Sequence, residues 1–188
     1  MHRVFFLTAA LLAGSAALAD RQFNYLEAAI STQNTDWDGY GDSTAGTVKA
    51  SLEFLDYLHL RGRYHAGNVK LPNGLQQETW TTYGLGLHYP FSGRTSVFIG
   101  GDHNEVEMKN DRPSERGWYY HIGVRHNVTE NWQLSLEAGE VDLIFRDATF
   151  EVNTVYSLLD SLGVSATLRD YNDLDLTEYE LGLRWFFR

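Results

Sequence analysis

Residues 177–188 close the chain and read T-E-Y-E-L-G-L-R-W-F-F-R. Every second side chain of this stretch is large and apolar, in the order Tyr179, Leu181, Leu183, Trp185 and Phe187. The side chains between them are Glu178, Glu180, Gly182, Arg184 and Phe186. An alternation of period two over this length predicts a β-strand with one apolar face and one mostly charged face.

The same alternation recurs upstream, so the sequence predicts an all-β fold of ten antiparallel strands. Besides the closing stretch, the predicted strands are Phe23–Ser31, Ala45–Phe54, Tyr57–Ala66, Thr79–Tyr89, Thr95–Asn104, Arg116–His126, Trp132–Glu140, Ala148–Leu158 and Leu162–Arg169. Beyond Gly139 the apolar set shifts to Val141, Leu143 and Phe145, which predicts a β-bulge. Eight strands with one long structured loop is the alternative count.

The predicted connections alternate between long polar loops of up to about 13 residues and tight turns of about 2. Long loops at one end, tight turns at the other and an even number of strands are typical of a transmembrane β-barrel. Both chain ends then fall on the periplasmic side. We therefore expect a closed, up-and-down antiparallel barrel.

The first residues have the pattern of an export signal. Met1-His2-Arg3 is basic, residues 4–13 are almost wholly apolar, and Ala17-Leu18-Ala19 precedes Asp20 as an A-x-A cleavage site. We predict a signal peptide over residues 1–19 and a single barrel domain over residues 20–188. Removing Arg3 with the signal leaves 14 basic and 25 acidic residues, a formal charge of −11.

Composition excludes several classes of protein. The chain has no cysteine, so it is not a disulfide scaffold. It carries no basic stripe that could bind nucleic acid. No segment after the signal approaches 18 consecutive apolar residues, so a transmembrane helix is not expected. If the chain enters a membrane, only a closed barrel can satisfy its backbone there.

Alternation alone also fits a soluble, lipocalin-like barrel with an apolar interior. The positions of the aromatic side chains favour the membrane alternative, because they gather at the strand ends of the apolar set, as at membrane interfaces. The predicted interface aromatics are Phe54, Tyr89, Trp118, Tyr120, Trp132, Trp185 and Phe187.

The aromatic-rich closing strand resembles that of small bacterial outer-membrane β-barrel proteins, the single-chain OmpA-barrel-like and porin-like group. That family ends its last strand in an aromatic residue, whereas here Arg188 follows the aromatic. The resemblance covers the whole mature chain through its pattern. It implies an integral outer-membrane location, contact with lipid and lipopolysaccharide, and recognition by the barrel assembly machinery through the closing strand. A monomer is favoured, and no nucleic-acid partner is expected.

The polar face of the strands predicts what fills the barrel. Aromatic side chains at Tyr57, Phe98, Tyr119 and Phe186 share this face and narrow it. The charged residues on it are nearly balanced, which predicts a paired network, because an unpaired charge in a narrow interior is costly. These residues are Glu27, Glu53, Asp102, Glu137, Glu151, Glu178 and Glu180, with Lys49, Arg61, Arg63, Arg125, Arg169 and Arg184.

Three functions follow from this interior. A barrel filled by side chains, with a structural or surface-interaction role, is the first. The alternative is a small-solute or ion pore, in which Lys49, Arg61 and Arg63 would attract anions. The third is a lipid- or peptide-modifying enzyme. We expect no enzyme, because the one adjacent acid–histidine pair, Asp102 and His103, must point to opposite faces of its strand.

The first loop carries the only motif that suggests a ligand. Asn34, Asp36, Asp38 and Asp42, with Gly39 in sixth place, have the spacing of an EF-hand calcium loop, but Ala45 stands in the twelfth position. A solvated acidic tip is the main expectation for this loop, with a weakly bound calcium ion as the alternative. No other cofactor is expected.

Overall fold

The computed structural model describes residues 23–35, 41–71, 74–109, 114–143 and 146–187, so the predicted signal peptide lies outside the described residues. Within these ranges the chain forms ten β-strands. They are β1 (Tyr25–Thr35), β2 (Gly41–Leu55), β3 (Leu58–Leu71), β4 (Gly74–Ser92), β5 (Thr95–Met108), β6 (Glu115–Asn127), β7 (Trp132–Asp142), β8 (Arg146–Leu159), β9 (Leu162–Tyr171) and β10 (Leu176–Phe186).

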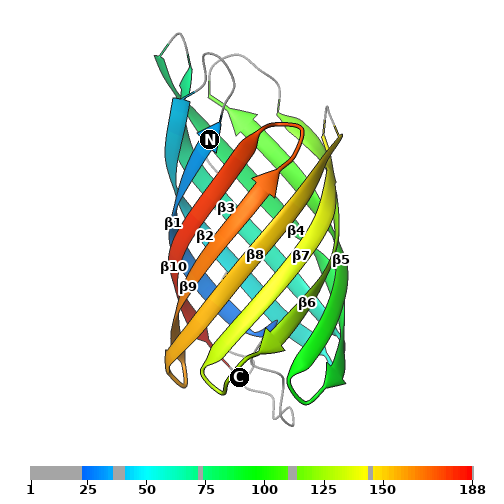
Figure 1. Cartoon of the computed structure of the whole chain (residues 1–188). Helices are drawn as coiled ribbons and strands as arrows, with labels where there is room; N and C mark the ends of the chain where they lie inside the picture. Colours follow the sequence, from blue (N-terminus) through cyan, green and yellow to red (C-terminus); the bar gives the residue numbers. More distant parts are fainter. Residues whose placement is uncertain (1–22, 36–40, 72–73, 110–113, 144–145, 188) are drawn as a thin grey trace.

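Each strand pairs antiparallel with its neighbours in sequence, and β10 returns to pair with β1 from Tyr25↔Phe186 to Thr35↔Leu176. The sheet is therefore a closed up-and-down barrel of tilted strands, with short turns gathered at one end (Figure 1). The predicted fold class and the count of ten strands are confirmed, and the eight-strand alternative is wrong. Among the described residues, no helix is long and apolar enough to cross a membrane.

The strands run further at the long-loop end than predicted. The segment 67–78, predicted as a loop, is mostly a continuation of the β3–β4 ladder, which pairs Gly67 with Glu78 and Leu71 with Gly74. Its polar composition misled the prediction. Two adjacent strands satisfy their backbone groups best by extending the ladder, whatever their side chains.

The bulge predicted beyond Gly139 is absent. The β7 ladder continues without a register shift, with Gly139 opposite His121 and Val141 opposite Tyr119. Val141 therefore points into the barrel, where it is 2% exposed. Register shifts do occur on β2, β4 and β8, close to the barrel ends.

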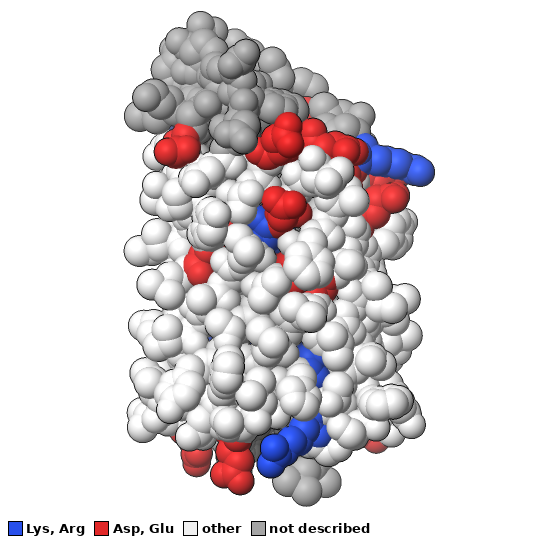
Figure 2. Space-filling model, viewed as in Figure 1, with Lys and Arg blue, Asp and Glu red and all other residues white. Residues whose placement is uncertain are grey.

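The outer face of the barrel is apolar. Figure 2 shows a broad belt with few charged side chains on the visible face, with mostly acidic side chains above it and both acidic and basic ones below. Six predicted interface aromatics are exposed on this surface, and Phe187 is half-buried. A closed sheet with an apolar exterior and its charges enclosed is the arrangement expected for lipid, not for water.

Glycines on the inner face make room for the rings that fill the barrel. A Cβ at Gly86 would lie 2.3 Å from the His59 ring on β3, and one at Gly123 would lie 2.3 Å from the Phe98 ring on β5. Each ring therefore lies flat over a neighbouring strand instead of projecting along the barrel axis. This packing lets large side chains share a narrow interior.

Candidate functional site

The thirteen charged residues predicted for the interior all lie on the inner face of the barrel. Several carboxylates are fully buried, with Asp102 and Glu178 both 0% exposed. Among the inner-face cations in the ion pairs described below, Arg61 has the most accessible side chain, at 23%, and Arg184 the least, at 3%.

One part of the charge network joins the strands around the barrel closure. Arg184 on β10 donates from Nε to Glu27 on β1 over 2.6 Å. Lys49 on β2 lies 3.4 Å from Glu27 and also donates to Glu180 on β10, across the intervening strand β1. These contacts tie the first strands of the chain to the last one.

A second group extends from β3 to β8. Arg63 donates from Nη2 to Glu178 over 2.6 Å and to Glu180 over 2.8 Å, so one guanidinium bridges both carboxylates of β10. Arg169 on β9 contacts the other oxygen of Glu178 at 3.3 Å and donates to Glu151 on β8. Each carboxylate of this group therefore has an arginine partner.

Arg61 makes the pairs that reach furthest across the lumen. Its Nε lies 3.0 Å from Asp102 on β5, and its Nη1 lies 3.1 Å from Glu137 on β7. Tyr119 donates its hydroxyl to the same Glu137 over 2.7 Å. Because β3 and β7 are four strands apart in the closed ring, these side chains meet across the barrel interior.

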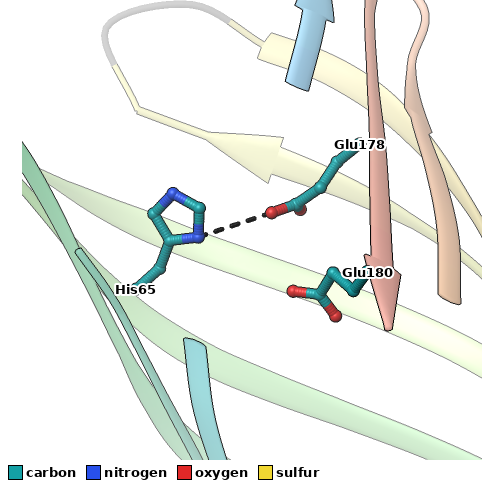
Figure 3. Close-up of side chains that lie close together, drawn as sticks. All are labelled: His65, Glu178 and Glu180. Atoms are coloured by element: carbon teal, nitrogen blue, oxygen red, sulfur yellow. Dashed lines mark ion pairs between the residues drawn. The ribbon is translucent and has the colours of Figure 1, made fainter. Parts of the chain in front are cut away.

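His65, Glu178 and Glu180 form the one group of possible metal ligands found among the described residues. Figure 3 shows His65 on β3 facing both carboxylates, with Nδ1 3.4 Å from Glu178. Both carboxylates already accept hydrogen bonds from Arg63, and His65 Nδ1 lies 3.1 Å from the Thr47 hydroxyl. A metal cation would have to displace guanidinium groups, so the trio is better explained as part of the network.

An apolar cluster fills the lumen towards the long-loop end. It consists of Trp80, Val106, Tyr119, Val141 and Tyr171, with Leu143, Leu174 and Leu176 packed against it. Sequence reasoning placed Tyr119 on the inner face but missed the cluster around it, because it assigned the strand parity from hydrophobicity. An unbroken count of alternate residues along β7 from Ser135 would have placed Val141 inside.

Phe23 closes the lumen at the short-turn end. It is 1% exposed and stacks on His88 with ring centroids 3.9 Å apart, while the Arg125 guanidinium lies 4.3 Å from its ring centroid. The neighbouring Asn24 fixes its position, because Asn24 Oδ1 accepts the Glu53 backbone N–H over 2.8 Å. Sequence reasoning also missed this closure of the lumen, because it assigned Phe23 to the start of a strand without an inward role.

A cavity of about 90 Å³ lies in the charged interior. All six basic residues of the inner face line it, but only two of the seven acidic ones do. These are Lys49, Arg61, Arg63, Arg125, Arg169 and Arg184, with Glu137 and Glu151. Neither Phe23 nor His88 lines it, whereas Trp80 and Tyr171 do.

The remaining predicted residues are placed as follows. Tyr57 lies in the β2–β3 turn, 51% exposed and stacked on Tyr89, so its predicted inward position is wrong. Asp102 points inward, whereas His103 contacts the outward rings of Tyr83 and Trp118.

The calcium motif is only partly described. Asn34 on β1 and Asp42 on β2 are exposed, and Asp36 and Asp38 lie outside the described residues. A calcium site in this loop stays a prediction.

Comparison with known proteins agrees with this architecture. A family model described as an outer membrane protein beta-barrel domain matches residues 5–187. No curated protein matches the chain. Among solved structures, a protein described as KdgM porin is 12% identical, with a TM-score of 0.51 over 87% of this chain and 99% of that one.

Two further solved structures share the fold. An outer membrane channel from Pseudomonas putida F1 is 10% identical, with a TM-score of 0.53 over 87% of this chain and 96% of that chain. The translocator domain of the autotransporter NalP from Neisseria meningitidis is 9% identical, with a TM-score of 0.53 over 87% of each chain. At these identities the likeness concerns the fold alone. The family match over nearly the whole chain and the closed ten-stranded barrel together show that this protein belongs to the outer-membrane β-barrel family.

Proposed function

We propose that this protein is a non-conducting outer-membrane barrel whose filled lumen gives it a structural or surface-interaction role. The observation that carries the proposal is the reach of Arg61 from β3 to Glu137 on β7, at 3.1 Å, across the middle of the lumen. An open water-filled channel would instead leave this guanidinium hydrated on its own wall.

The two ends of the interior support the same conclusion. The cluster around Trp80 and Tyr171 occupies one end, and Phe23 stacked on His88 occupies the other. A void of about 90 Å³ between them has room for a few water molecules, each of which needs at least about 10–15 Å³. Such a lumen holds the wall together but offers no continuous path for solutes.

Because the lumen is closed, the outer surface of the barrel is the part that can contact other molecules. Its belt contacts outer-membrane lipid, and its outer hairpins, with exposed acids such as Asp170 and Asp173, meet lipopolysaccharide and the medium. The closing strand is the part through which the assembly machinery would recognise the chain.

Planar bilayer recording of the refolded protein tests the proposal. We expect a silent membrane, with insertion verified by the heat-dependent shift in gel migration that folded barrels show. Stepwise conductance in the wild-type protein would contradict the proposal and favour the pore.

A further inference from the structure

The charged side chains that border the cavity are mostly positive. Glu27, Asp102 and Glu178 are 0% exposed and do not line it, whereas Lys49, Arg63 and Arg169, each 10% exposed, do. Arg184, at 3%, lines it too, and the acids that reach it are Glu137, at 8%, and Glu151, at 15%. The cavity is therefore bordered by six cationic side chains and only two acidic ones. Although the inner face as a whole is nearly neutral, the positive ends of its ion pairs point towards the void.

A small anion fits this environment better than a cation does. The cavity, of about 90 Å³, is several times the roughly 10–15 Å³ that one water needs by the same measure, so a halide ion can enter with part of its hydration shell. Polar groups also border the void, among them Thr82, Asn104, Ser135 and Asn153, and the hydroxyl and amide groups can donate hydrogen bonds. In a low-dielectric interior the surrounding guanidiniums attract such an ion more strongly than in water.

We infer that the cavity is an anion site, which holds one small inorganic anion of halide size against the inward-facing arginines. Arg61 is the principal contact, because its side chain, at 23%, is more accessible than those of the other lining cations in the ion pairs described above, which are at 3–10%. The site goes beyond the non-conducting role proposed above, since a cavity between the two closures of the lumen can hold an ion without conducting it.

Two substitutions change the charge of the cavity in opposite directions while preserving hydrogen bonds. Glu151→Gln removes one of the two lining acids, and the amide oxygen can still accept from Arg169. Asn104→Asp adds a lining acid, and its carboxylate can still accept from the Trp80 indole at 3.2 Å and the Thr82 hydroxyl at 2.7 Å. Glu130→Gln, in the exposed β6–β7 turn, is the matched control for a change of one charge.

The probe is bromide. Each protein is refolded in sodium bromide or, at equal ionic strength, in sodium gluconate, whose anion is much larger than bromide. The bromide dependence of the thermal unfolding midpoint gives an apparent affinity. Anomalous scattering at the bromine absorption edge then locates the ion in crystals of the refolded protein.

We expect bromide to stabilise the wild-type protein and to occupy the lumen beside Arg61. Glu151→Gln should bind about tenfold more tightly and Asn104→Asp about tenfold more weakly, with Glu130→Gln unchanged. Equal stability in bromide and gluconate, or bromide found only on the outer surface, would overturn the inference. Planar bilayer silence is independent of this outcome, so failure of the anion site and failure of the non-conducting role are distinguishable.

Discussion

Replacing Arg61 by methionine tests how strongly the enclosed charges depend on one another. The change leaves Asp102, at 0% exposure, and Glu137, at 8%, without the cation that lies 3.0 and 3.1 Å from them. Removing one partner of a buried ion pair costs about 3–5 kcal/mol, because an uncompensated charge stays in the interior. Since Arg61 is itself 23% exposed, we expect the lower end, about 3 kcal/mol.

The assay is urea unfolding in lipid vesicles, followed by tryptophan fluorescence and gel migration. The triple variant Arg61→Met, Asp102→Asn, Glu137→Gln should return to within about 1 kcal/mol of wild type, because no buried charge is then left unpaired. Arg116→Met is the control, since its ion pair with Glu105 is on the surface, with the arginine side chain 64% exposed, and should cost less than about 1 kcal/mol. An Arg61→Met cost as small as the control would refute the reasoning and indicate carboxylates hydrated by an open channel.

Three pairs of substitutions probe the closures and the outer face by the same unfolding assay. Gly86→Ala should cost about 1–3 kcal/mol, because its Cβ would lie 2.3 Å from the His59 ring. Gly46→Ala, whose Cβ would have nothing within 4 Å, should be nearly neutral. Equal effects of the two substitutions would contradict the packing of rings over glycines. Phe23→Ala should cost about 3 kcal/mol. Phe23→Leu should cost about 1 kcal/mol, because leucine fills the space but cannot stack on His88. A neutral Phe23→Ala would mean that the ring does not fill the lumen. Leu181→Arg, at a site 65% exposed in the middle of β10, should cost about 2–4 kcal/mol in bilayers. Leu159→Arg, at the end of β8, should cost no more than about 1 kcal/mol. The reverse order would contradict a membrane centred on the middle of the strands.

Much of the fold was predictable because a barrel strand has a simple period. The alternation in residues 177–187 placed Glu178, Glu180 and Arg184 inside and Leu181, Leu183 and Trp185 outside, and the structure has the same arrangement. Side chains on one strand must alternate between lipid and lumen, so a single strand with a clear pattern fixes its own orientation.

The predictions failed where hydrophobicity no longer indicates which face a residue occupies. Val141 and Phe23 are apolar yet lie in the lumen, because the interior needs closures where the ionic network ends. The strand extensions within 67–78 lack a clear apolar alternation and contain a Pro-Asn-Gly turn signal, so they resemble a loop in sequence. Contacts such as Arg61 with Glu137, separated by 76 residues, follow from barrel closure and register, which no local pattern encodes.

The central claim is that the lumen is closed to solutes, and the natural absence of cysteine permits a direct measurement. Ser135 lines the cavity at 7% exposure, and a Ser135→Cys variant places a thiol there with almost no change in volume. We predict that a negatively charged thiol reagent, sulfonatoethyl methanethiosulfonate, which an open cationic lumen would attract, leaves this thiol unmodified until the protein is unfolded, while it modifies the exposed Glu130→Cys control at once. Modification of both thiols at similar rates in the folded barrel would contradict a closed lumen.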